Sequence, residues 1–185
     1  MLKKLYSETE NKMKKTVEIL RTELVKIRTG RANPGLVEDI KVESYGAQMP
    51  LSQLASITVP EPRQLLIRPW DKNILPQIEK AILKSDLGLT PSSDGNVIRL
   101  NIPLLTEENR QNISKLVHRI GEENKIAIRN IRRQAIETTK LMKKEKKISE
   151  DDEKKGEEKI QKLTDSYIEE IDRILKVKDK EILES

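Results

Sequence analysis

The sequence predicts an α+β fold, in which a long three-helix bundle is interrupted by a small domain of mixed strands and helix. Three observations predict it. Apolar residues recur at helical spacing near both ends of the 185-residue chain, an alternating strand pattern occupies the middle, and the helical pattern that stops near residue 30 returns only at Thr106. We therefore expect residues 1–30 and 106–185 to form the bundle and residues 31–105 to form an inserted domain.

A seven-residue repeat predicts the first helix. Its apolar stripe consists of Tyr6, Met13, Val17, Leu20, Leu24 and Ile27. Gly30 suits a left-handed helix cap, and Pro34 prevents the helix from continuing. We expect this helix to end next to Gly30.

Two further helices are predicted after the insertion. Thr106 is a candidate N-cap, and the helix that it begins should continue to about Lys144. Ser149, followed by three acidic residues, is typical of a capping box that begins the third helix. The apolar face of the second helix is expected at Ile113, Leu116, Val117, Ile120, Ala127, Ile131, Ala135 and Met142, and that of the third at Ile160, Leu163, Tyr167, Ile171, Ile174, Leu175 and Ile182.

The inserted domain should contain short strands and one helix. Tyr45 and Gly46 favour a turn between the first two strands, and Pro76 and Gly88 mark the first turn and the end of the helix. Strands are predicted at residues 37–44, 47–51, 56–59, 64–70 and 96–102, and the helix at residues 73–85.

Two connections join the predicted domains. One consists of Arg31, Ala32, Asn33 and Pro34, and the other of Pro103, Leu104 and Leu105. Two neighbouring backbone segments that cross between the same two domains are typical of a hinge. We expect these seven residues to form it.

The composition excludes several classes of function. The chain has no cysteine and only one histidine, so thiolate catalysis, Cys-based zinc sites and multi-histidine metal sites are excluded. Aromatic residues make up only 2% of the chain, which argues against RNA readout by base stacking. Neither a signal segment nor a run of about 20 apolar residues occurs. We expect a cytoplasmic protein without a catalytic site, a metal or a cofactor.

Basic side chains gather on the second helix. Lys125, Arg129, Arg132, Arg133, Lys140, Lys143 and Lys147 fall within about 100° of arc, nearly opposite the predicted apolar face. Arg129, Arg132 and Arg133 have no acidic residue between them, and like charges at this spacing oppose one another unless an anion offsets them. The alternatives are an ordinary solvated face or a surface for RNA phosphates.

Arg28 and Arg31 extend this basic surface or, alternatively, cap the first helix at the negative end of its dipole. Gly30 and Gly35 have the outer spacing of a phosphate-binding loop, but the residues that follow lack its Lys and Ser/Thr. Nucleotide binding there is rejected. On these patterns a cationic helical rod that binds structured RNA ranks first, a helical scaffold for RNA or protein partners second, and an enzyme third.

The chain also resembles the bacterial ribosome recycling factor family. The resemblance rests on segments that follow one another in the family's order along nearly the whole chain, at residues 26–34, 42–46, 50–55, 79–82, 85–89, 103–108, 129–133 and 148–152. Ser44 and Gln134 depart from the residues that are common in the family, and neither is one of the arginines.

The resemblance implies an L-shaped protein with a three-helix bundle and a β/α/β domain. It implies a monomeric translation factor that binds the post-termination ribosome, with the bundle on large-subunit RNA between the subunits. Elongation factor G, which uses the GTP, would act on it to split the ribosome, and initiation factor three would keep the subunits apart. The matching contact residues are Arg28, Arg31, Arg129, Arg132 and Arg133, with Arg132 first, and Lys125 joins them from the basic arc.

Overall fold

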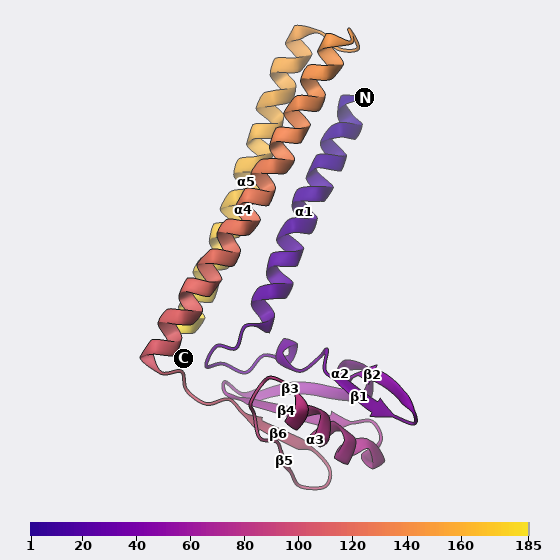
Figure 1. Ribbon diagram of the computed structural model, residues 1–185, viewed down its shortest axis with the longest axis vertical. Helices are drawn as coiled ribbons and strands as arrows, with labels where there is room; N and C mark the ends of the chain where they lie inside the picture. The colour runs from indigo at the N-terminus through magenta and orange to yellow at the C-terminus, as the bar shows by residue number, and fades with distance from the viewer. Residues whose placement is uncertain (185) are drawn as a thin grey trace. The chain divides into compact units, whose positions relative to one another are not determined.

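The computed structural model describes residues 1–184, which divide into two compact units (Figure 1). The helical unit consists of Met1–Leu24 and Ser114–Lys180, and the small unit of Val25–Ile113 and the residues from Glu181 onward. The boundaries expected from the sequence lie at residues 30 and 106. The contacts therefore place the segments beside both boundaries in the small unit.

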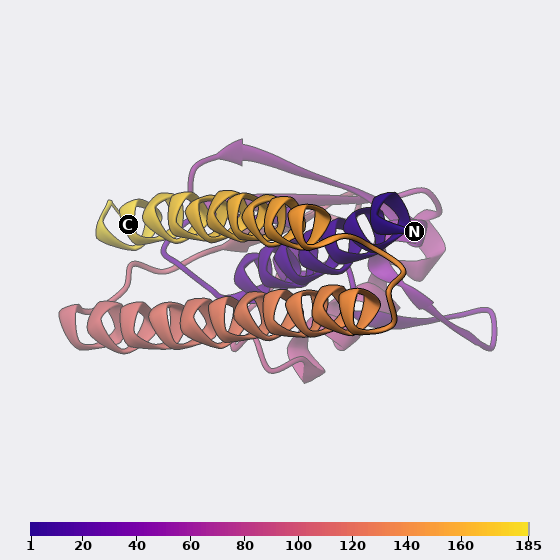
Figure 2. The same cartoon turned by 90° about the horizontal axis from the view of Figure 1, so that it is seen from above.

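Three long helices build the helical unit, and Figures 1 and 2 show them side by side. Met13 of α1, Ile128 of α4 and Ile160 of α5 are completely buried, so all three helices supply the core. The predicted three-helix bundle is confirmed. No helix within residues 1–184 is long and apolar enough to cross a membrane. The helices span Leu2–Lys26 (α1), Glu107–Lys144 (α4) and Glu150–Leu183 (α5).

The end of α1 differs from the prediction. The helix ends at Lys26, four residues before Gly30, so the expected cap at Gly30 is wrong. Lys26, the last residue of the helix, and Arg28 after it make contacts within the small unit instead. Lys26 lies 3.1 Å from a carboxylate oxygen of Asp39, and Arg28 donates a hydrogen bond of 3.0 Å to the carbonyl of Leu87. These tertiary contacts replace the last helical turn.

The starts of α4 and α5 agree with the prediction. The Thr106 hydroxyl accepts a hydrogen bond from the backbone N–H of Asn109, at 3.2 Å. The Ser149 hydroxyl accepts one from the N–H of Asp152, at 3.1 Å, and the Asp152 carboxylate accepts one from the N–H of Ser149, at 3.2 Å. This reciprocal pair is a capping box, and it satisfies N–H groups that the helix itself leaves without partners.

The small unit contains a two-stranded and a four-stranded antiparallel sheet. In the first, Tyr45 (φ 49°) and Gly46 (φ 82°) form the predicted turn. In the second, the strand order is β3-β4-β6-β5. The strands span Lys41–Ser44 (β1), Ala47–Pro50 (β2), Ala55–Glu61 (β3), Gln64–Pro69 (β4), Ser92–Ser93 (β5) and Ile98–Asn101 (β6).

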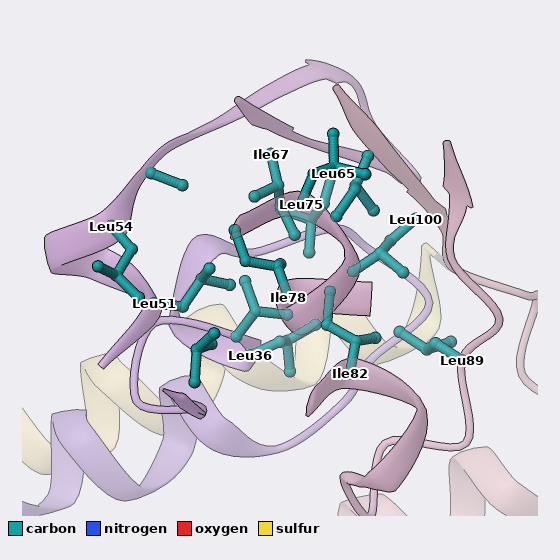
Figure 3. Close-up of a cluster of buried hydrophobic side chains, with 14 of the residues drawn as sticks. Leu36, Leu51, Leu54, Leu65, Ile67, Leu75, Ile78, Ile82, Leu89 and Leu100 are labelled. Carbon is teal, nitrogen blue, oxygen red and sulfur yellow. The ribbon is translucent and has the colours of Figure 1, made fainter. Parts of the chain in front are cut away.

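A helix covers one face of the four-stranded sheet. In Figure 3, Ile78 and Ile82 of α3 (Leu75–Lys84) lie among Leu65, Ile67 and Leu100 of the strands. All five side chains are completely buried. This face is the core of the small unit, and alternate strand residues point to the opposite face.

Several short elements were placed wrongly or missed. The strand expected from residue 37 begins only at Lys41, because Pro34–Leu36 forms a 3-10 turn (η1). A second 3-10 turn at Lys72–Ile74 (η2) takes up the start of the helix expected at 73–85. The single-turn helix α2 (Leu51–Leu54) and the two-residue strand β5 were not predicted. A single helical turn and a two-residue strand are too short to show the spacing of apolar residues from which helices and strands are predicted.

Candidate nucleic-acid interface

The buried stripe of α4 is not the one expected. Its fully buried positions are Val117, Gly121, Asn124, Ile128, Ala135 and Thr139. Of these, only Val117 and Ala135 belong to the apolar face predicted from the sequence. Ile113, Leu116, Ile120, Ala127, Ile131 and Met142 are only partly buried.

Small and polar residues cause the difference. Gly121 leaves room for Leu175 of α5, whose Cδ1 lies only 2.4 Å from where a Cβ on residue 121 would be. Asn124 and Thr139 enter the interior because their side chains donate to carbonyls one turn earlier, both at 2.9 Å. A search for apolar residues misses all three. The buried stripe of α4 therefore lies closer to the basic arc than predicted. Around the helix axis the two are separated by about a quarter of a turn, whereas the predicted apolar face lay nearly opposite the basic arc.

As a consequence, part of the basic arc borders α5 and is neutralised by it. Lys140 lies 3.8 Å from Glu157, and Lys143 lies 2.6 Å from Glu153. The acidic residues of α5 thus offset the charge of the second helix directly, so these lysines do not form a free phosphate-binding ridge.

Lys125 is also held by carboxylates. Its Nζ lies 2.7 Å from Asp172 of α5 and 3.1 Å from Glu122, and the side chain is only 14% exposed. The hydrogen bond to Asp172 raises the pKa of Lys125 most, against the opposing effect of burial. The structure therefore places Lys125 in a contact between helices, apart from the exposed arginines.

The arginine cluster of α4, meaning Arg129, Arg132 and Arg133, remains available to a partner. Arg129 and Arg133 are exposed, and within residues 1–184 no carboxylate lies within 4 Å of either guanidinium. Arg132 is half-buried, and its Nη1 donates a 3.2 Å hydrogen bond to the amide oxygen of Gln161 on α5. Gln161 itself donates to Asp165, at 2.8 Å. A neutral amide thus orients Arg132 without neutralising it, which leaves its charge for an external anion.

The two arginines near the start of the small unit lie apart from this cluster in the chain and have partners of their own. Arg28 donates to the Leu87 carbonyl, and Arg31 lies 2.7 Å from the Glu184 carboxylate. The Arg31 pair is almost half exposed on both sides, so solvent and salt weaken it. The Leu87 carbonyl is neutral and leaves the charge of Arg28 uncancelled, whereas an RNA phosphate would have to displace the Glu184 carboxylate from Arg31.

The predicted hinge residues, at 31–34 and 103–105, all lie within the small unit as the contacts divide the chain, and they have defined contacts. The Ala32 N–H donates to the Pro62 carbonyl at 2.8 Å, and the Asn33 side chain accepts from the Gly35 N–H at 2.9 Å. In the second connection Leu104 is 61% exposed, whereas Leu105 is buried. Leu104 is thus little constrained by packing, as are the exposed Arg31 and Pro103.

No group of three or more His, Asp and Glu side chains within residues 1–184 is arranged to hold a metal ion. His118, the single histidine, lies 2.9 Å from Asp179 in an ion-pair geometry between α4 and α5. A long helix with unpaired guanidinium groups, in a chain whose described residues include no such metal-binding group, has the features of a polyanion-binding protein rather than of a metalloenzyme.

Comparisons with known proteins give a specific family. The family model described as ribosome recycling factor matches residues 20–183. Ribosome-recycling factors of Syntrophomonas wolfei and Heliobacterium modesticaldum are 57% and 56% identical over 184 residues, and both alignments cover 100% of each chain.

Solved structures agree. A solution structure of the ribosome recycling factor superposes with a TM-score of 0.79 at 45% identity, covering 100% of this chain and 98% of the other. A second match, with a TM-score of 0.72 and 49% identity, covers 99% of both chains. It comes from models of the T. thermophilus ribosome recycling factor and the E. coli elongation factor G bound to the E. coli post-termination complex. The chain belongs to the ribosome recycling factor family.

Proposed function

We propose that this protein binds the post-termination ribosome through the arginine cluster of α4 and, together with elongation factor G and GTP, separates the ribosomal subunits. The RNA contact is inferred from Arg129 and Arg133. Their guanidinium groups are exposed, and among residues 1–184 neither has a carboxylate partner. The structurally similar recycling factor bound with elongation factor G to a post-termination complex supports the choice of partners.

Ribosomal RNA fits this cluster because arginine presents two parallel N–H donors that match phosphate oxygens. Arg132 contributes to the same surface, since its charge is oriented by Gln161 and not cancelled. Each phosphate contact releases counterions, so binding of the large subunit should weaken as salt increases. A scaffold that binds protein partners through apolar helix surfaces would respond little to salt.

The separation of the ribosomal subunits requires a movement, which we assign to the predicted connections. The helical unit anchors on large-subunit RNA, and the small unit moves about the connections at residues 31–34 and 103–105 when elongation factor G acts on it. GTP belongs to elongation factor G, so this chain contributes no catalytic group and no cofactor of its own. Initiation factor three would then keep the separated subunits apart, and the protein would act as a cytoplasmic monomer.

Replacing Arg132 with Ala tests the RNA contact. Cosedimentation with large ribosomal subunits should weaken, and the slope of log affinity against log salt should become shallower by about one contact. Arg119→Ala is the matched control, because Arg119 is an exposed arginine of the same helix that is paired with Glu123 at 3.9 Å. Equal binding and equal slopes for both variants would remove Arg132 from the interface.

The recycling activity itself is tested by sedimentation of post-termination ribosomes. Intact ribosomes should disappear only when this protein, elongation factor G and GTP are all present. If separation proceeds at the same rate without this protein, the proposed function is wrong.

A further inference from the structure

The four-stranded sheet has a second face, opposite to the one that α3 covers. Burial alternates along β4, with Leu65 and Ile67 completely buried and Leu66 and Arg68 on the other side. The hydrogen bond from Gln64 to Asn101 of β6, at 3.2 Å, joins two side chains on that same side. We call this side the outer sheet face. It includes Ser56, Thr58, Gln64, Leu66, Arg68, Arg99 and Asn101, and Trp70 follows the end of β4.

The strand register brings the two arginines together. Arg99 of β6 lies directly opposite Leu66 of β4, and Arg68 is two residues further along β4. Diagonal neighbours of this kind are about 7–8 Å apart at their Cα atoms. Both arginines are exposed, so their guanidinium groups can reach one ligand from adjacent strands.

These two charges are not neutralised by the face itself. Within residues 1–184 no carboxylate lies within 4 Å of either guanidinium. Glu61 and Asp94 lie at the margins. The Asp94 carboxylate accepts from the backbone N–H groups of Asn96 and Val97, at 2.9 and 3.0 Å. These two hydrogen bonds lower the pKa of Asp94 most, and the charge of Arg99 contributes less, so Asp94 offsets Arg99 only in part. The middle of the outer sheet face therefore has two cations and no anion.

Trp70 adds an exposed aromatic surface. It directly follows Pro69, the last residue of β4, so it lies at the end of that strand two residues from Arg68, and it is 70% exposed. Leaving so large a ring in water forgoes the free energy that burial would give, and exposed Trp and Arg are enriched where partners bind. The chain has no other tryptophan.

We propose that the outer sheet face binds a short single-stranded segment of RNA. The indole of Trp70 stacks on one unpaired base, while Arg68 and Arg99 hold neighbouring phosphates. Neutral hydroxyl groups of Ser56 and Thr58 complete the surface and suit sugar and base edges. An acidic peptide would satisfy the arginines but would leave the flat indole face without a planar partner, so RNA is favoured.

This contact is separate from the arginine cluster of α4, because it belongs to the small unit and uses stacking. The low aromatic content excludes a sheet that reads several bases, but one ring and two arginines suffice for one to three nucleotides without sequence readout. The inference therefore adds a second RNA-binding site to the proposed function and does not depend on it.

The single tryptophan provides the test. A uridine decamer added to the full-length protein in dilute buffer should quench Trp70 fluorescence, and log affinity should fall with log salt with a slope of about −1.4 for two phosphate contacts on a single strand. Arg68→Ala and Arg99→Ala should each halve this slope and weaken binding. Lys80→Ala and Lys84→Ala, which remove exposed lysines of α3 elsewhere in the small unit, are matched controls and should leave quenching unchanged.

Two outcomes overturn the inference. One is the absence of saturable quenching by the decamer. The other is equal quenching by a decamer of glutamate, which would make the surface a site for acidic protein segments. A variant with Arg129, Arg132 and Arg133 all replaced by Ala should retain the Trp70 signal while losing cosedimentation with large subunits. A failure of the α4 site and a failure of the outer sheet face are thereby distinguished.

Discussion

At the scale of single residues, Gly121 shows how the helical unit depends on a missing side chain. A Cβ at this position would lie 2.4 and 2.8 Å from the two methyl carbons of Leu175, which is itself buried. We expect Gly121→Ala to destabilise the protein by about 1–2 kcal/mol, because overpacking of a core costs more than the roughly 1 kcal/mol that alanine contributes to helix propensity. Urea unfolding followed by circular dichroism measures the change.

Gly156 is the matched comparison. A Cβ there would meet the hydroxyl of Tyr6 at 2.9 Å, which is the far end of a half-buried side chain that can move aside, and Cγ2 of the buried Thr139 at 3.3 Å, which needs a shift of only a few tenths of an ångström; the helix propensity gained by alanine offsets this cost. Gly156→Ala should therefore be close to neutral. A loss of stability at Gly156 as large as that at Gly121 would show that helix spacing, and not the Leu175 contact, sets the cost.

At the scale of elements, the start of α5 rests on its capping box. Ser149→Ala removes the hydroxyl that caps the N–H of Asp152, and we expect a loss of about 1 kcal/mol in the free energy of unfolding at neutral pH. The control is Ser166→Ala, because Ser166 is exposed to solvent and lies in the middle of α5, away from its ends. It should change the free energy of unfolding by no more than about 0.5 kcal/mol. If both substitutions cost the same, the cap does not contribute.

The same capping box predicts a pH dependence. The hydrogen bond from the Ser149 side chain, followed by that from its backbone, lowers the pKa of the Asp152 carboxyl below its ordinary value of 3.8. A lowered carboxyl pKa stabilises the fold fully above pH 3.8 and loses this effect as the pH falls through the lowered pKa. The stability difference between the original protein and Ser149→Ala should therefore narrow below pH 3.8. A constant difference from pH 7 to pH 3 would contradict the role of the carboxylate.

At the scale of the whole molecule, the predicted connections at residues 31–34 and 103–105 are expected to transmit force from the rest of the small unit to the helical unit. Inserting two glycines after Arg31 and two after Leu104 makes both connections slack. Binding to large subunits should remain within about twofold, because the arginine cluster of α4 is untouched, whereas subunit separation with elongation factor G should slow at least tenfold. Cosedimentation and light scattering measure the two effects.

The control for this prediction is an insertion of the same length elsewhere. Two glycines placed in the exposed turn after Gly95 lengthen the small unit without loosening a connection. Separation at the original rate with slack connections would reject the hinge. Equal slowing by the Gly95 insertion would show that the shape of the small unit, and not its tether, is what matters.

The sequence by itself determined the three long helices, the caps that begin α4 and α5, and the helix that carries the arginine cluster, because Thr106, Ser149 and the seven-residue repeat act over one or two helical turns. Only the tertiary structure decided which way α4 faces. Gly121 lies in the interior because Leu175 packs against it, and Asn124 and Thr139 do so because their side chains donate hydrogen bonds to backbone carbonyls. The spacing of apolar residues along the sequence does not predict these positions. That rotation brings Lys125 to Asp172 and leaves Arg129 and Arg133 free, since packing between helices, and not residue type, sets which charges remain unpaired.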